Sequence, residues 1–205
     1  MSAILAKKIG MTQRFLEDGK VERVTVLEAG PCPVTAIRTQ DRDGYQAVQL
    51  AFGATKEKHL SKPELGHLKA AGASAHKHLV EFRDEAGELS LGDTVTVDAF
   101  AAGDKVKISG VSKGKGFQGT IKRHNFASGP KSHGSHNVRA PGSIGASAWP
   151  ARVMKGIRGP GQMGSARITQ RGVTVVDVIA AKNLLLVRGA VPGPKGGIVE
   201  VRTDA

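Results

Sequence analysis

The sequence of 205 residues contains one cysteine, few aromatic side chains and no long apolar run. A lone Cys32 excludes a disulfide framework and a cysteine-based metal site, as is usual in a reducing cytosol. Its position between two prolines (PCP) disfavours a role as a nucleophile. No segment approaches the roughly 18 apolar residues of a membrane-spanning helix, and the start, MSAILAKKIGMTQ, lacks the apolar region of an export signal. We therefore expect a cytoplasmic protein without a membrane anchor.

Acidic residues are missing from one long part of the chain. Residues 105–176 carry 13 lysines and arginines but no aspartate or glutamate, whereas the rest of the chain sums to a net charge of −1. The whole formal charge of +12 therefore comes from this window. A solvated surface ordinarily interleaves both signs of charge, so the window predicts contact with a polyanion. Nucleic acid is the default partner, and an acidic membrane surface is the less favoured alternative.

Helical or strand periodicity is also missing from the middle of this window, between about residues 127 and 165. The window holds 13 of the 27 glycines, together with Pro130, Pro141, Pro150 and Pro160. Such a segment cannot offset its own ordering entropy in isolation, and it is typical of an extended loop that a partner orders. We predict a globular domain made of residues 1–125 and 166–205, with residues 126–165 as the extended loop.

The flanking sequence predicts many short strands separated by turns. The first 30 residues read as a β-hairpin with a turn at Asp18-Gly19, and residues 61–71 read as a helix with Ser61 as N-cap and Pro63 in its first turn. Short strands in this number favour a barrel or a sandwich. The other predicted strands are Val34–Thr39, Tyr45–Phe52, His78–Arg83, Thr94–Val97, Lys105–Val111, Val173–Ala180, Leu184–Val187 and Ile198–Arg202.

The segment GKGFQG (residues 114–119) has the spacing of a dinucleotide-binding loop. That site needs a helix after the third glycine and an acid about 20 residues later. The following TIKRHNFASGP has no helical periodicity, and no acid occurs before Asp177. We interpret the segment instead as a turn against a sugar-phosphate backbone, with Lys113 and Lys115 at phosphates and Phe117 packing within the chain or stacking on a base.

Other residues of the basic window suggest contacts rather than catalysis. His124, His133 and His136 have no cysteine or carboxylate nearby, which disfavours a metal site and acid–base catalysis. Residues 122–125 (KRHN) form a basic cluster at the end of a predicted strand. Trp149, the only tryptophan, is either a core anchor or a contact to a nucleobase or a partner groove.

Four stretches together resemble bacterial ribosomal protein L-three, the third protein of the large ribosomal subunit. They are ILAKKIGMTQRF, ISGVSKGKGFQGTIKRHNF, RAPGSIGASAWPARVMKGIRGPGQMG and NLLLVRGAVPGPKGG. The resemblance runs from end to end and is densest over residues 107–197. It implies a mainly β fold, a translation-factor-type β-barrel with a short helical insertion and a long irregular basic extension that penetrates rRNA.

The resemblance also implies a function and partners. Members of this family are structural proteins of the cytoplasmic ribosome, without a cofactor or a small-molecule substrate, and they are not enzymes. They bind large-subunit rRNA near its 3′ end and help to nucleate subunit assembly. Their extension approaches the peptidyl-transferase centre, and large-subunit proteins fourteen and nineteen are expected neighbours of the globular part.

The expected RNA-binding residues all lie in the basic window. Gln162, in GPGQMG, matches a glutamine that is methylated in some bacterial members, although Trp149, Pro160 and Ser165 depart from the common family pattern. The alternatives from other classes are a regulatory binder of free RNA or DNA and a nucleotide-dependent enzyme acting through GKGFQG. The predicted contacts are Lys113, Lys115, Lys122, Arg123, His124, Asn125, Lys131, Arg139, Trp149, Arg152, Lys155, Arg158, Gln162, Arg167 and Arg171.

Overall fold

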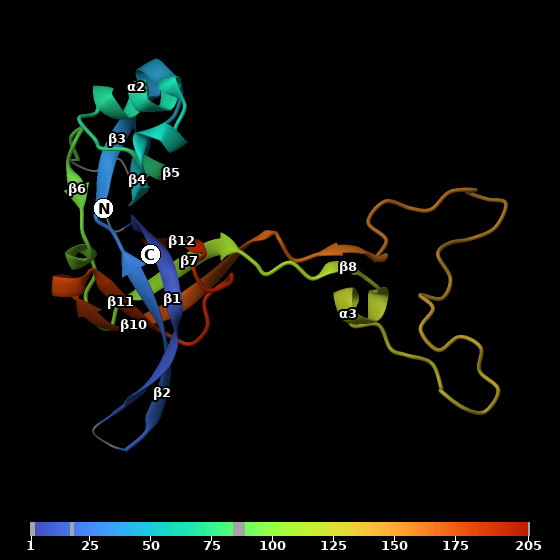
Figure 1. The fold of residues 1–205 in the computed structure, drawn as a ribbon. Coiled ribbons are helices and arrows are strands. Elements are labelled where there is room, and N and C mark those ends of the chain that lie inside the picture. The colour runs from blue at the N-terminus through green and yellow to red at the C-terminus, as the bar shows by residue number, and fades with distance from the viewer. Residues whose placement is uncertain (1–2, 17–18, 84–88, 205) are drawn as a thin grey trace. The chain divides into compact units, whose positions relative to one another are not determined.

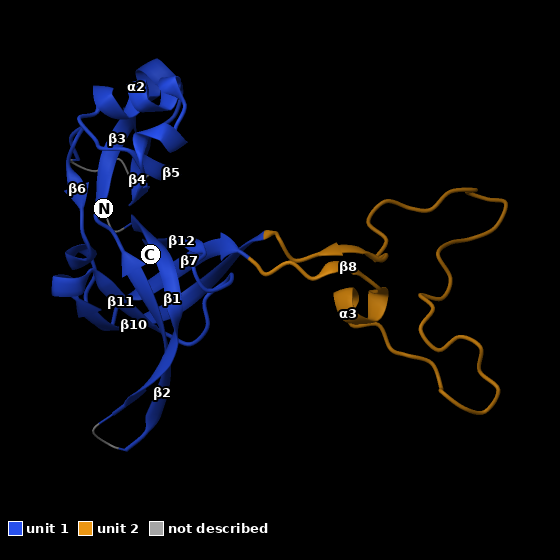
Figure 2. Ribbon diagram, in the orientation of Figure 1, with its two compact units in different colours: residues 1–111, 167–205 blue, residues 112–166 orange. Residues whose placement is uncertain are grey.

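The computed structural model describes residues 3–16, 19–83 and 89–204 (Figure 1). The chain divides into two compact units, shown in different colours in Figure 2. Unit 1 comprises residues 1–111 and 167–205, and unit 2 comprises residues 112–166. We call unit 1 the barrel unit and unit 2 the arm. No helix among the described residues is long and apolar enough to cross a membrane.

Six antiparallel strands close into a barrel in the order β1-β12-β7-β10-β11-β2. The closed hydrogen-bonding order confirms the predicted barrel and rules out the sandwich that the strand pattern alone left open. The predicted opening hairpin is present as β1 paired with β2, although Asp18 of its predicted turn lies outside the described residues. The strands are β1 (Ala3–Phe15), β2 (Val21–Ala29), β7 (Lys105–Val111), β10 (Arg167–Ile179), β11 (Leu184–Arg188) and β12 (Ile198–Thr203).

A second sheet, in the order β5-β4-β3-β6, belongs to the same unit. It carries the predicted helix α2 (Lys62–Ala70), in which the Ser61 backbone N–H donates to the Glu64 carboxylate at 2.8 Å. Its strands are β3 (Cys32–Arg38), β4 (Ala47–Ala54), β5 (His76–Arg83) and β6 (Thr94–Val95). Short helical turns connect the elements of the unit: α1 (Gln40–Asp43), η1 (Glu57–His59), η2 (Val97–Ala99) and η3 (Ala180–Lys182).

One hydrophobic core joins the barrel and the second sheet. In β7, Val106 and Ile108 alternate with less buried residues, as expected of a strand with one covered face. The first four residues of β1 (AILA) are all buried, because both faces of this strand are covered. Apolar side chains from β3, β4 and β5, including the fully buried Phe82, complete the core.

Cys32 lies in this core, with its side chain donating to the Leu5 carbonyl oxygen at 3.6 Å. Burial raises the pKa of the Cys32 thiol to about 12, so the thiolate is not populated near neutral pH. The thiolate is the reactive form of cysteine. The geometry therefore agrees with the interpretation that Cys32 is not a nucleophile.

Lys8 is a buried cation that anchors the connection between β11 and β12. Its ammonium donates to the Val191 carbonyl oxygen at 2.7 Å and to the Gly193 carbonyl oxygen at 3.3 Å. Replacing Lys8 with Met removes these hydrogen-bond donors from one buried and one partly buried carbonyl oxygen. We expect the free energy of unfolding to fall by about 1–3 kcal/mol, measured by urea denaturation. Lys7→Met, at the exposed neighbouring position, is the control, and an equal loss in both variants would contradict the anchoring role.

Candidate RNA-binding arm

The arm begins and ends as an antiparallel ribbon. The Ser112 N–H donates to the Ala166 carbonyl oxygen at 2.9 Å, and the Lys115 N–H donates to that of Met163, also at 2.9 Å. Further along, β8 (Gly116–Gln118) pairs with β9 (Gly161–Met163). Residues 112–125, predicted as part of the globular domain, therefore belong to the same compact unit as the predicted loop. The division falls here because these residues pair with the returning limb.

Glycines allow the two limbs of the ribbon to approach each other closely. Gly164 has φ +72°, and a Cβ there would collide with the carbonyl group of Lys113. A Cβ on Gly114 would lie 2.7 Å from the Ser165 hydroxyl oxygen. The glycine-rich composition of this segment thus has a structural cause inside the arm, in addition to any close approach to a ligand.

A single helical turn, α3 (Thr120–His124), follows β8 directly. The sequence predicted no helix here and placed residues 122–125 at the end of a strand; both predictions are wrong. Five residues are too few to show periodicity, and the turn ends where Asn125 adopts the left-handed conformation at φ 59°. A dinucleotide-binding site needs a parallel βαβ unit with a longer helix than α3. The segment lacks this unit, because β8 pairs only with β9 in a two-stranded antiparallel ribbon.

Two basic side chains of α3 hold the returning limb. The Arg123 guanidinium donates to the Gly159 carbonyl oxygen at 2.7 Å, and His124 Nε2 lies 3.1 Å from the same oxygen. Because a carbonyl oxygen only accepts, Nε2 carries the proton in this arrangement. A Cβ on Gly161 would lie 2.9 Å from the Arg123 guanidinium. Arg123 and His124, both predicted RNA contacts, therefore have a role in shaping the arm.

The arm has almost no buried surface of its own. Of residues 112–166, all of which are described, only Thr120 is buried. No helix or strand is present between α3 and β9, and residues 129–138 are drawn together by the Gly129 N–H donating to the Val138 carbonyl oxygen at 3.0 Å. Apolar side chains, among them Phe126, Ile144 and Ile157, line an open hollow of about 260 Å³. A segment of this kind gains little from burial to offset the entropy of ordering.

The arm is positively charged without compensation. It contains nine lysines and arginines and no acid, so no carboxylate within the unit can pair with any of them. Lys113, Lys115, Lys122, Lys131 and Arg139 are exposed, as are Arg152, Lys155 and Arg158. His133 and His136 are exposed as well, and no group of acids, histidines and cysteines that could hold a metal ion occurs among the described residues.

Two of the predicted contacts, Arg167 and Arg171, lie on β10 in the barrel unit instead of in the arm. The Arg167 guanidinium forms an ion pair with Glu200 at 2.5 Å, so part of its charge is already compensated. Arg171 is exposed. The structure therefore groups thirteen of the fifteen predicted residues in the arm and assigns the other two to a barrel strand.

The arm also exposes two aromatic rings. Trp149 is 86% exposed and Phe117 is 75% exposed. The alternatives in which Trp149 anchors a core and Phe117 packs within the chain are therefore wrong. Phe117 lies opposite Gln162 in the β8–β9 ribbon, so the two side chains share one face. Gln162 is exposed too. Exposed rings beside cations are typical of surfaces that stack on unpaired bases.

Similarity to known proteins shows which family the chain belongs to. Residues 45–183 match the family model described as "Ribosomal protein L3". A large ribosomal subunit protein uL3 from Acidothermus cellulolyticus is 52% identical over 207 residues, covering 100% of this chain and 93% of the relative. Another protein of the same name, from Syntrophotalea carbinolica, is 53% identical over 201 residues, covering 97% and 96%. The chain therefore belongs to the ribosomal protein L3 (uL3) family, whose members are structural proteins of the large ribosomal subunit and not enzymes.

Proposed function

We propose that this chain, a structural constituent of the large ribosomal subunit in the cytoplasm, binds large-subunit rRNA through its arm. The observation that carries the proposal is the arm itself: nine cations, no acid and a single buried residue. Binding near the 3′ end of the rRNA would help to nucleate subunit assembly, with the arm directed toward the peptidyl-transferase centre. Large-subunit proteins fourteen and nineteen are the proposed neighbours of the barrel unit.

Both the charge of the arm and its extended backbone suit RNA as a partner. Lysines and arginines along an extended backbone can follow a sugar-phosphate chain, and glycines leave room for phosphates near the peptide groups. The exposed rings of Phe117 and Trp149 supply surfaces for bases that are not paired. An acidic membrane surface would also attract the positive charge of the arm. It would not require exposed aromatic rings and cations along an irregular backbone.

The first test is where the native protein sediments when a cell lysate is fractionated on a sucrose gradient in high salt. We expect stoichiometric recovery with the large subunit, because contacts along an arm threaded through RNA resist screening better than isolated surface charges. Recovery mainly at the top of the gradient would contradict the proposal and favour a binder of free RNA.

The electrostatic contribution can be measured by salt titration. Changing Lys113, Lys115, Arg152 and Lys155 together to Gln should lower the slope of log affinity against log salt by about 3, since each phosphate contact contributes about 0.7–0.9. Trp149, as the only tryptophan, reports binding through its emission. The control removes four exposed lysines of the barrel unit, Lys56, Lys58, Lys62 and Lys69, and should change the slope by less than about 1. Equal losses in both variants would count against the arm.

We also propose that Gln162 is a site of side-chain amide methylation. The amide is exposed on the ribbon, where a modifying enzyme can reach it before the arm is bound by RNA. Mass spectrometry of the native peptide containing Gln162 should show the mass of one added methyl group. A fully unmodified peptide would exclude this proposal without affecting RNA binding.

A further inference from the structure

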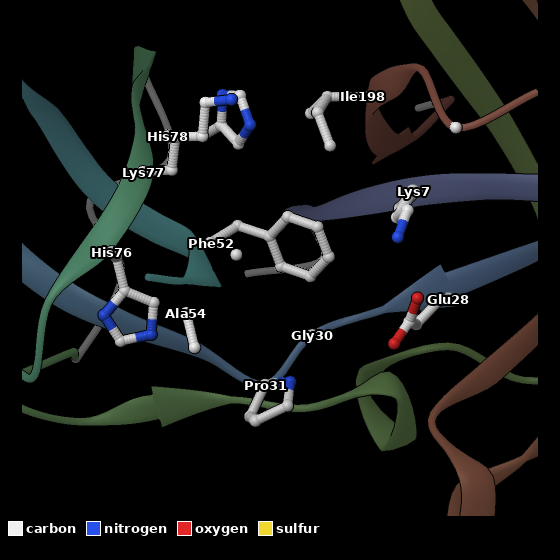
Figure 3. Close-up of a pocket in the computed structure, with 12 residues that line it drawn as sticks. Lys7, Glu28, Gly30, Pro31, Phe52, Ala54, His76, Lys77, His78 and Ile198 are labelled. Atoms are coloured by element: carbon white, nitrogen blue, oxygen red, sulfur yellow. The ribbon is translucent and has the colours of Figure 1, made fainter. Parts of the chain in front are cut away.

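The barrel unit contains a cavity of about 640 Å³ whose walls come from two sheets (Figure 3). One wall is a lateral row across three barrel strands, in which Lys7 of β1 lies opposite both Ile198 of β12 and Glu28 of β2. The other wall comes from β4 and β5, where Phe52 lies opposite His78. In this view Lys7 and Glu28 occupy one end, the two histidines His76 and His78 the other, and the Phe52 ring lies between them.

Two glycines of the cavity wall have left-handed backbone conformations. Gly53 has φ +77°, and a Cβ there would lie 3.4 Å from the His78 ring. Gly30 has φ +72°, and a Cβ there would lie 3.0 Å from the Ile4 side chain. A side chain at either position would strain the backbone. The volume is within the range of pockets that hold small ligands.

The cavity offers polar groups that the protein does not use. Lys7 and Glu28 are exposed cross-strand neighbours, yet no ion pair or side-chain hydrogen bond joins them to each other or to any other described residue. His76 Nδ1 lies 2.8 Å from the Ser74 carbonyl oxygen, so Nδ1 is the donor, and no hydrogen bond to Nε2 is present among the described residues. Burial of His78, and to a lesser extent the charge of Lys77, lowers the pKa of His78 and so favours its neutral ring.

These groups match one class of ligand. A carboxylate accepts two parallel hydrogen bonds, and an unpaired guanine presents two adjacent donors, N1–H and the 2-amino group, beside its O6 acceptor. A lysine ammonium next to the carboxylate can donate to O6. Imidazole rings supply flat surfaces on which a base can stack, and His76 and His78 provide such rings here.

We propose that this cavity binds one unpaired guanine nucleotide of RNA, with Glu28 accepting from the base and Lys7 donating to it. The proposal rests on the proposed rRNA-binding function and adds to it a base-specific contact on the barrel unit. An acidic peptide is the competing occupant, but it would be repelled by Glu28 and would gain nothing from the flat rings.

Mononucleotides test the pocket without rRNA. Amide shifts of the full-length protein would be followed by NMR during titration with GMP, IMP, UMP and inorganic phosphate to about 10 mM, above the dissociation constant of a weak millimolar contact. GMP should shift the amides of Lys7, Glu28, Gly53 and His78. IMP, which lacks only the 2-amino group, should bind several-fold more weakly. Equal responses to GMP, UMP and phosphate, or no response to any of them, would overturn the proposal.

Glu28→Gln gives a second test in which the sign of the effect is decisive. If the cavity only attracts phosphates or an acidic peptide, removing the negative charge of Glu28 should strengthen the binding of that ligand. If the carboxylate accepts hydrogen bonds from a base, the same change should weaken rRNA binding about tenfold. Glu57→Gln, at an exposed position on η1 without a described side-chain partner, is the matched control. A thermal melt checks that both variants fold.

The two proposals can fail separately. If wild-type protein binds rRNA tightly and Glu28→Gln binds it equally or more tightly, the guanine site is excluded and the arm proposal stands. If wild-type protein shows no preference for rRNA while GMP still shifts the cavity amides, the function assigned to the arm is wrong and the cavity remains a guanine-binding site.

Discussion

A chain in which an Asn-Gly turn replaces residues 112–166 is expected to fold normally and to bind rRNA at least about 100-fold more weakly than the intact protein at moderate salt. Val111 and Arg167, the residues on either side of the deletion, already lie opposite each other in β7 and β10. A two-residue turn of this type joins antiparallel strands without distorting them. The deletion therefore leaves the strand pairing intact.

The barrel unit should retain its cooperative unfolding, because every buried residue of the described chain except Thr120 lies outside the deleted segment. The cooperative unfolding of the barrel unit would be measured by circular dichroism during heating. The loss of affinity follows from the removal of nine cations and two exposed rings, and filter binding measures it. Undiminished rRNA binding would show that the barrel unit is the main contact, and loss of the cooperative transition would show that the arm supports the core.

Gly164→Ala is expected to have the second-largest effect, on binding and not on stability. The added methyl group would collide with the Lys113 carbonyl group, so the two limbs at the root of the arm must separate. Cations and rings further along the arm would then be presented without a fixed spacing. We expect rRNA affinity to fall by about 10- to 100-fold, with little change in the melting temperature of the barrel unit.

Gly156→Ala is the matched control for this prediction. Gly156 also has a left-handed φ, +84°, but nothing lies within 4 Å of the position of its added Cβ. Both variants carry the same backbone penalty, of about 1 kcal/mol, and only Gly164→Ala adds the collision. Equal losses of affinity would show that arm flexibility, and not the closeness of the two limbs, determines binding.

The sequence was sufficient to locate the barrel strands because short apolar runs lie between turns that carry glycine, although β10 begins at Arg167, six residues before the predicted Val173. Lys105–Val111 was predicted with the bounds that β7 has in the structure. The basic window was equally clear, since an absence of acids over that length is independent of conformation. The sequence did not decide between a sandwich and a barrel, because closure of the barrel depends on which distant strands pair.

The internal structure of the arm could not be predicted for a related reason. The β8–β9 ribbon has three residues in each limb and no alternation of apolar and polar side chains. Its formation depends on Gly164 and Gly161 passing close to Lys113 and Arg123, which are far away in the sequence. The cavity of the barrel unit was missed as well, because Lys7, Glu28 and His78 come together only through strand pairing and the packing of two sheets.

The place of β12 in the barrel sets an order of events during synthesis. β12 lies between β1 and β7, and it follows the arm in the chain. Until β12 has been translated, β1 and β7 each have an unpaired edge, and such edges promote aggregation. Pairing of the most distant segments also slows folding, since it closes the longest loop. The basic arm of the nascent chain is therefore complete before the barrel can close, and the unpaired edges of β1 and β7 are open to aggregation during this interval.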